Sequence, residues 1–518
     1  MTAPIPAYSP TFLADSRWST RILLLGLAGI LFLTLYPFRF DLPHHLTANG
    51  PSVLVQGWGK DSGPFDSFLN VLLFIPFGFG LAGRFQERGK SRLLTLGLTL
   101  AIGALISYTI ESLQVYVPSR DSGWEDVLTN SIGAVVGCLL FILCGPAVLR
   151  FLSTCETALE SFLTPGRSAL VLAIYIGLWI AISVPLQEES RLSNWDPSSL
   201  LVIGNAASGQ PSSAWRGKVF RLEFWDHALP AALAERLTSG VPGDVGAPRP
   251  LAAYDFSAAP PFKDRSHFLP DLSWIPRAPV STGSTSVVLD GTSWLVSQAP
   301  ISALVDDVQS TGQFSIRLAC APDDVNGVNA PIVSASHNPG LLNFEFRQQG
   351  SILVFWFRTP LTVKRARVAS LTSDIFALNK QRDLLFSYDG SNLAEYVDGK
   401  EQRRIYRLGP STRLAEFILR AKAAELEGYE YIFYALVFFP AGCLAGLAGR
   451  KTPGQPMNQS LLIFFGVLFP AVLLEILLVR ISGRPASLEN IALSILLALF
   501  GSLWINAGRR ARVVHQAS

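Results

Sequence analysis

Long apolar runs lie towards both ends of the chain and flank a more polar middle. A transmembrane helix needs about 20 predominantly apolar residues to cross the hydrocarbon core. Runs that meet or nearly meet this length occupy residues 21–38, 67–83, 93–117, 127–149, 168–186, 430–449, 460–479 and 489–507. The pattern predicts a polytopic α-helical membrane protein with about eight transmembrane helices.

The run 67–83 is short and contains Asn70 and Pro76. Irregular backbone survives at membrane depth only where protein or a water-filled cavity surrounds it. A continuous helix and a broken or re-entrant helix both remain open for this run.

Composition supports the membrane class, because only 16% of the residues are charged, against about 25% in soluble domains. The net charge of +3 is too small to predict a nucleic-acid partner. Among the five cysteines, only Cys320 lies in the polar middle, so a disulfide framework is not expected. No small-residue cleavage site follows the first apolar run, which predicts a retained helix.

Basic residues predict the orientation in the membrane. If the eight helices alternate, one side carries Arg17, Arg21, Arg84, Arg88, Lys90, Arg92, Arg150, Arg167, Arg450, Lys451, Arg509, Arg510 and Arg512. The positive-inside rule makes that side the cytoplasm. We therefore expect both termini inside, a cytoplasmic tail at 508–518 and an extracytoplasmic segment at 187–428.

The two helical regions share a pattern at a fixed offset of 364 residues. FDSFLNVLLFIPFG (65–78) matches YEYIFYALVFFPAG (429–442), and later matches pair Glu111 with Glu475 and Arg120 with Arg484. We call residues 66–149 segment one and residues 430–507 segment two. The match predicts an internal duplication into two four-helix units, at 1–150 and at 168–186 with 430–507. An even number of helices gives both units one orientation, as in parallel-repeat transporters.

Residues three or four apart are neighbours on one face of a helix. Segment one has three such polar pairs: Asp66 with Asn70, Glu111 with Gln114, and Asp126 with Asn130. Topology places these pairs at the outer helix ends. The candidate catalytic residues are Glu111, Arg120 and Asp126, and the candidate substrate-binding residues are Asp66, Asn70, Gln114 and Asn130. Arg120 can hold two carboxylates, or a carboxylate and a phosphate, in a fork. The cluster is either an outward-facing site or a set of interhelical hydrogen bonds and ion pairs that holds the helices together.

Segment two carries Glu430, Glu475, Arg484 and Glu489 where segment one has Asp66, Glu111, Arg120 and Glu125. Tyr434, Leu478, Asn490 and Ser494 stand where segment one has Asn70, Gln114, Asp126 and Asn130. We interpret segment two as carrying a degenerate second site.

FDSFLNVLLFIPFG and ESLQVYVPSRDSGWEDVLTNSIGAVVG (111–137) resemble the VanZ-like family. That family's pattern is Asp-x3-Asn-x5-Pro-x-Gly, then Glu-x2-Gln, an Arg, and Asp-x3-Asn-x2-Gly. The residues that match it are Asp66, Asn70, Pro76, Gly78, Glu111, Gln114, Arg120, Asp126, Asn130 and Gly133. The resemblance covers about residues 20–150, and more weakly 168–186 with 430–507. It implies a cell-envelope role linked to teicoplanin resistance, located in the bacterial cytoplasmic (inner) membrane, and no defined reaction.

The polar middle alternates apolar and polar residues in FSIRLACA (314–321), LNFEFRQ (342–348), ILVFWFR (352–358) and RDLLFSYDG (382–390). Asp-Gly turns at 389–390 and 398–399 separate short strands, which predicts an all-β sandwich over 190–425. LLFSYDGSNLAEYVDGKE (384–401) is similar to laminin-G/concanavalin-A-like domains. LLVIGNAASGQPSSAWRGKVFRLEFWDHAL (200–229) resembles the closing strands of that fold, which here come first, as in a circular permutation.

Candidate ligand chemistry in the middle is sparse. Five tryptophans can stack on sugar rings or pack in the core, and the core interpretation is favoured: Trp215, Trp225, Trp274, Trp294 and Trp356. Asp306, Asp307, Asp323 and Asp324 offer oxygen ligands of the kind that calcium prefers, but they lack the spacing of an EF-hand. A calcium site is therefore the less favoured alternative, and no metal site or cofactor is predicted.

Three functions follow as alternatives. The first is an envelope protein whose membrane site handles a cell-wall or lipid-linked glycan, with a lectin-like exported domain. The second is a parallel-repeat transporter, which charge pairs at the inner side would favour. The third is a non-catalytic membrane anchor or scaffold for a glycan- or protein-binding domain. The lipid bilayer is a partner in each, and catalysis is left open.

Overall fold

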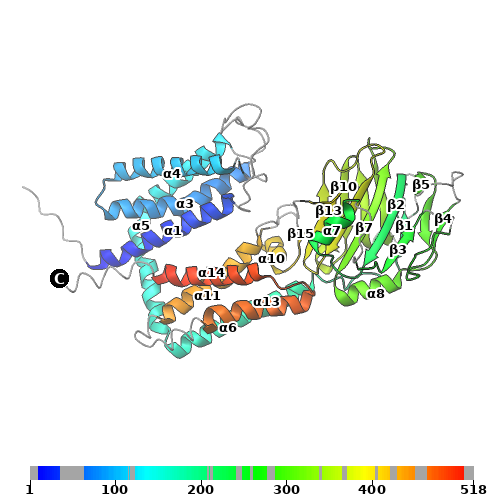
Figure 1. The fold of residues 1–518 in the computed structure, drawn as a ribbon. Helices are drawn as coiled ribbons and strands as arrows, with labels where there is room; N and C mark the ends of the chain where they lie inside the picture. Colours follow the sequence, from blue (N-terminus) through cyan, green and yellow to red (C-terminus); the bar gives the residue numbers. More distant parts are fainter. Residues whose placement is uncertain are drawn as a thin grey trace, which may run out of the picture. The chain divides into compact units, whose positions relative to one another are not determined.

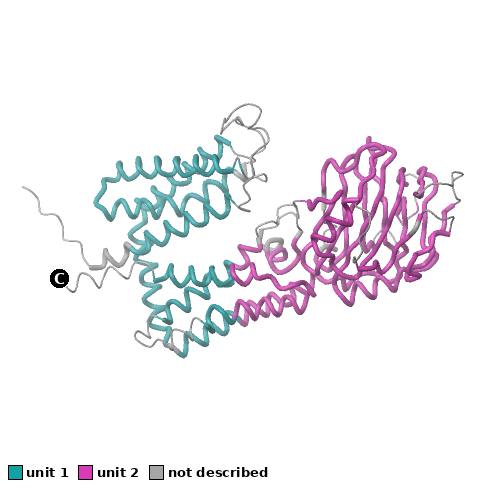
Figure 2. The backbone as a smooth tube through the Cα atoms, in the orientation of Figure 1, with its two compact units in different colours: residues 1–176, 435–469, 494–518 teal, residues 177–434, 470–493 magenta. Residues whose placement is uncertain are grey.

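Figure 1 shows the protein in a computed structural model. It describes residues 10–35, 64–114, 116, 123–206, 209, 214–240, 248–256, 261–276, 286–337, 341–363, 370–402, 406–419, 429–449 and 464–506. The chain forms two compact units (Figure 2). Unit 1 contains residues 1–176, 435–469 and 494–518, and unit 2 contains residues 177–434 and 470–493.

Eight helices in the described residues are long and apolar enough to cross a membrane, which confirms the predicted number. The described helical elements outside the β domain are α1 (Pro10–Leu35), α3 (Pro64–Glu87), α4 (Arg92–Gln114), α5 (Trp124–Phe162), α6 (Pro165–Glu188), α11 (Tyr429–Gly449), the π-helical turn η3 (Phe464–Leu468), α13 (Phe469–Ser482) and α14 (Leu488–Asn506).

The structure decides one open alternative and corrects one helix boundary. Helix α3 is continuous through Pro76, so the broken-helix alternative is wrong. Helix α5 does not end near residue 149 but continues to Phe162, which places Arg150 inside the helix rather than in a loop. The run RFLSTCETALESF contains no glycine or proline to stop it. At 1.5 Å per residue its 39 residues span about 58 Å, well beyond a hydrocarbon core of about 30 Å.

Glycines let helix backbones touch at equivalent positions of the two segments. A Cβ on Gly78 would lie 2.0 Å from the carbonyl oxygen of Ala134, and a Cβ on Gly442 would lie 1.9 Å from that of Ala498. A Cβ on Gly137 would lie 2.2 Å from the carbonyl oxygen of Ile75, and a Cβ on Gly501 would lie 2.2 Å from that of Phe439. Each pair of positions differs by 364 residues. Small residues of this kind allow close helix packing in membranes.

The middle of the chain forms a β-sandwich in unit 2. One sheet has the order β11-β10-β9-β8-β1-β6-β4, and the other has the order β14-β13-β12-β7-β2-β3, with β15 on β13 and β5 on β2. The strands are β1 (Leu200–Ile203), β2 (Arg216–Trp225), β3 (Ala252–Asp255), β4 (Leu272–Ile275), β5 (Val287–Asp290), β6 (Trp294–Ser297), β7 (Phe314–Pro322), β8 (Asn329–Ser336), β9 (Leu342–Gln349), β10 (Ile352–Phe357), β11 (Ser370–Thr372), β12 (Arg382–Tyr388), β13 (Asn392–Val397), β14 (Lys400–Glu401) and β15 (Tyr406–Arg407).

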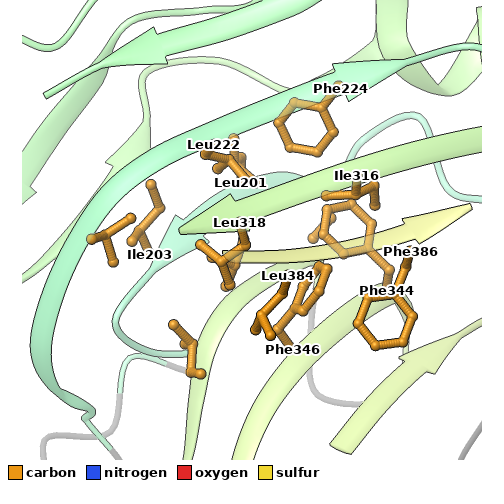
Figure 3. Close-up of a cluster of buried hydrophobic side chains, with 14 of the residues drawn as sticks. Leu201, Ile203, Leu222, Phe224, Ile316, Leu318, Phe344, Phe346, Leu384 and Phe386 are labelled. Atoms are coloured by element: carbon orange, nitrogen blue, oxygen red, sulfur yellow. The ribbon is translucent and has the colours of Figure 1, made fainter. Parts of the chain in front are cut away.

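The four alternating stretches form strands β7, β9, β10 and β12, as the sequence predicts. Their apolar positions meet between the sheets, where β1 and β2 also contribute (Figure 3). The outer face of the second sheet is covered by α7 (Ala231–Thr238), so that Leu233 packs with Leu385 and Tyr396. The other helices of this region are α8 (Ser302–Thr311), α9 (Pro360–Val363) and α10 (Pro410–Leu419).

Tryptophan burial removes most of the candidate sugar-stacking surface. Trp215, Trp225 and Trp294 are buried, with exposed fractions of 0%, 2% and 7%. Nε1 of Trp215 donates to Gln348 Oε1 at 2.6 Å. Sugar stacking is therefore wrong for these three, and only Trp274 and Trp356 are partly exposed.

Candidate functional site

The predicted site residues of segment one that the structure describes lie at one end of a helix bundle in unit 1. Helices α1, α3, α4 and α5 pack together, and at this end α1 and α4 finish while α3 and α5 begin. We call it the polar end. At 1.5 Å per residue, Glu111 lies about 4.5 Å from the end of α4 and Asn130 about 9 Å from the start of α5.

Glu111 ties the end of α4 to the start of α5. Its side chain is almost completely buried, and Oε2 accepts the backbone N–H of Gly123 at 3.0 Å. Gly123 precedes α5 and has no side chain to cap that helix. A carboxylate so deeply buried is stable only with strong donors around it.

Polar side chains also join α3 to α5. Nδ2 of Asn70 donates to Oδ1 of Asp126 at 2.7 Å, and the Ser67 hydroxyl donates to Oε1 of Glu125 at 3.0 Å. The sequence predicted that Asn70 and Asp126 lie near one another, and the structure makes them direct partners on different helices. Ser67 was missed, although it follows Asp66 at the same helix start.

Two amide side chains at the polar end are only half satisfied. Gln114 donates from Nε2 to the carbonyl oxygen of Thr34 at 2.9 Å, and Asn130 donates from Nδ2 to the Ser107 hydroxyl at 2.9 Å. Within the described part of the chain, Oε1 of Gln114 and Oδ1 of Asn130 have no hydrogen-bond partner, although both residues are buried. Burying such an acceptor unpaired costs about 1–3 kcal/mol, so these oxygens are suited to a ligand that donates hydrogen bonds.

Arg120 and the side chain of Asp66 lie outside the described residues. The predicted ion pair of Arg120 with Glu111 or Asp126 therefore stays a prediction.

The equivalent residues of segment two form a complete ion pair in unit 2. Arg484 donates from Nη1 and Nη2 to the two carboxylate oxygens of Glu475, each at 2.7 Å. The backbone N–H of Ser487 donates to Glu475 at 2.7 Å. Burial lowers the pKa of Arg484, but its hydrogen bonds with Glu475 outweigh this and raise the pKa overall. Glu475 thus accepts the N–H twelve residues further along, as Glu111 does in segment one.

A cavity of about 540 Å³ adjoins this ion pair, also in unit 2. Its helical side is lined by Glu430, Tyr434, Leu478, Arg484, Ser487, Glu489 and Asn490. Five of these, Glu430, Tyr434, Leu478, Arg484 and Asn490, occupy the positions that the sequence comparison matched with the candidate site of segment one. Glu430 forms an ion pair with Arg407 of β15. The sequence did not predict Arg407 as a site residue, because a strand as short as β15 leaves no clear pattern of alternation.

A charged site at the opposite end of the unit 1 bundle was also missed. Arg21 of α1 is fully buried and donates to Glu156 of α5 at 2.7 Å and to the carbonyl oxygen of Ile505 at 2.5 Å. Its guanidinium carbon lies 5.0 Å from the ring centroid of Trp18 and 5.7 Å from that of Trp504. From the sequence, Arg21 indicated only the orientation in the membrane. Its partner Glu156 lies in the part of α5 beyond residue 149, where no helix was predicted.

Among the described residues, no group of three or more His, Cys, Asp or Glu side chains is placed to hold a metal ion. All five cysteines are free. The described architecture is that of a multi-pass helical membrane protein with an added antiparallel β domain.

Comparison with known families adds one match. The VanZ/LLP1 family model matches residues 11–145, which span α1 to α5 and nearly all of segment one. This match supports the VanZ-like resemblance for that part of the chain. No curated protein and no solved structure matches the chain.

Proposed function

We propose that the polar end of the unit 1 bundle binds the polar part of a cell-wall or lipid-linked saccharide at the outer face of the bacterial cytoplasmic membrane. The observation that carries the proposal is the pair of buried oxygens of Gln114 and Asn130, which have no hydrogen-bond partner among the residues that the structure describes, together with the buried Glu111. All three groups accept hydrogen bonds. Saccharide hydroxyl groups donate them, and a lipid anchor would place those hydroxyls at this depth.

The proposed orientation keeps residues 187–428 outside the cytoplasm and both termini inside. A catalytic version of the proposal gives Arg120 a phosphate or carboxylate to hold and gives Glu111 or Asp126 a proton to transfer. Asp66 and Asn70 then line the same site.

Binding can be measured on the full chain in lipid nanodiscs, with a polyprenyl-diphosphate-linked disaccharide as the probe. A hydrogen bond to a charged group contributes about 1.5–3 kcal/mol, so Glu111→Gln should weaken binding at least tenfold. Asn130→Ala should also weaken it. Gly97→Ala is the matched control, because a Cβ at Gly97 of α4 meets no atom within 4 Å. Unchanged affinity in both site variants overturns the proposal, and absence of binding by the wild type favours a scaffold.

Transport of the same saccharide lipid is the second candidate function. It is favoured by the buried ion pair Arg21–Glu156 at the bundle end opposite Glu111, because alternating access needs a closure at each end. The test is movement of a fluorescent saccharide lipid between the leaflets of proteoliposomes. Transport predicts protein-dependent movement whose rate changes in Glu156→Gln while affinity stays the same. Without such movement, the binding function stands alone.

A further inference from the structure

The cavity of unit 2 has two walls of different origin. One wall consists of helix ends and carries Tyr434, Leu478 and Glu489, and the other carries Ser391 and Asn392 of the sandwich together with Arg407 of β15. Its volume of about 540 Å³ falls in the range of about 300–1,000 Å³ that is typical of small-molecule sites. We propose that this cavity is a second binding site, and that it accommodates a neutral saccharide.

The two walls are held together by close backbone contacts. A Cβ on Gly390 would lie 2.0 Å from the carbonyl oxygen of Ser482, and a Cβ on Gly483 would lie 2.8 Å from that of Thr311. Nε2 of Gln313 donates to the carbonyl oxygen of Gly483 at 2.6 Å. The loop that carries Arg484 is therefore fixed against the sandwich, and a preformed pocket loses less conformational entropy when a ligand binds.

Charge in the pocket argues for a neutral ligand. Each lining arginine already has a carboxylate partner, since Arg484 pairs with Glu475 and Arg407 pairs with Glu430. Glu489 is exposed and adds a negative charge. A free phosphate would therefore meet neutralised cations and an additional anion. Carboxylates, amides and hydroxyls instead match the donors and acceptors of sugar hydroxyl groups.

Differences between the two segments give the pocket its apolar part. Tyr434 and Leu478 stand where segment one has Asn70 and Gln114. Both line the cavity and are otherwise buried. Their exposed fractions of 4% and 2% make them a small apolar patch of the cavity wall rather than a stacking platform, so the polar wall carries the contacts with the sugar hydroxyls. The degenerate residues of segment two are thus read as a change of ligand chemistry rather than as loss of a site.

The experiment uses the full chain in nanodiscs and titrates N,N′-diacetylchitobiose, a lipid-free neutral disaccharide, with inorganic phosphate as the comparison. Ala486 is exposed and lines the cavity, so Ala486→Trp should fill it without disturbing the core. We expect the wild type to bind the disaccharide, Ala486→Trp to weaken binding at least tenfold, and the matched Ala486→Ser to bind as the wild type does. Equal thermal stability of both variants verifies folding.

Three results would overturn the inference: no disaccharide binding by the wild type, equal binding by Ala486→Trp, or binding of phosphate in place of the sugar. The inference does not depend on the proposed function, which is tested with the lipid-linked probe and Glu111→Gln. Failure of one test therefore leaves the other intact.

Discussion

Arg484 and Glu475 form a two-point ion pair in which each Nη atom lies 2.7 Å from a different carboxylate oxygen. Both side chains are buried, with exposed fractions of 7% and 3%. Arg484 follows Glu475 by nine residues, as Arg120 follows Glu111. This geometry is the pattern that we expect for Arg120 and Glu111.

Removing one partner of the buried pair should destabilise the protein strongly. Breaking such a pair costs about 3–5 kcal/mol, because the remaining charge is left buried without compensation. Glu475→Gln should therefore lower the melting temperature, followed by tryptophan fluorescence of the full chain in detergent. Asp398→Asn is the matched control, because it breaks the ion pair between Asp398 and Arg382, whose side chains are more exposed than those of Glu475 and Arg484. Exposed pairs contribute about 0–1 kcal/mol. Equal effects of the two variants would contradict the structural role of Glu475.

A substitution of Arg120 should distinguish a role in ligand binding from a role in folding. Arg120→Lys keeps the positive charge but loses the fork that holds two oxygens. We expect this variant to insert and fold normally, while binding of the saccharide lipid falls at least tenfold. If the amount of folded protein falls in parallel with binding, Arg120 stabilises the fold and is not part of a binding site.

The duplication that we propose predicts paired effects of glycine substitutions. Gly78→Ala and Gly442→Ala each push a methyl group into a facing helix backbone, and such overpacking typically costs about 1–3 kcal/mol. Gly97→Ala should be neutral or slightly stabilising, because space is open there and alanine favours helix. Melting temperatures of the three variants are the measurement. A tolerated Gly442→Ala beside a disruptive Gly78→Ala would mean that the two segments pack differently.

Topology can be checked with reporter fusions. A phosphatase that is active only outside the cytoplasm should be active when fused after Gly240 and inactive when fused after Arg92. The physical reason is the accumulation of Arg and Lys in alternate connections, which are retained in the cytoplasm. An inactive fusion after Gly240 would reverse the predicted orientation.

The β domain should fold by itself. Residues 190–425 are expected to give a soluble protein with a mostly β circular-dichroism spectrum, because the sandwich has a continuous core of its own. Cys320 is the only cysteine in this range, and burial raises the pKa of its thiol. The folded domain should therefore react slowly with iodoacetamide at pH 8, and urea should make the reaction fast. Rapid labelling without urea would show that the isolated domain lacks the core.

Elements with a strong local signal could be predicted from the sequence. Long apolar runs predicted the eight helices, and period-two alternation predicted β7, β9, β10 and β12. Both signals depend on residues close together in the chain. The candidate site was also partly predictable, because polar residues inside apolar helices stand out locally, as Glu111 and Asn130 do.

Long-range partners were decided only by tertiary structure. The local pattern could not show that Asp126 accepts from Asn70, that Glu156 reaches Arg21, or that three tryptophans are buried. The cavity beside Arg484 likewise needs the sandwich, whose Ser391 and Asn392 come from a different part of the chain. Hydrophobic periodicity reports which side chains avoid water, whereas a hydrogen bond or a pocket depends on positions that only packing brings together.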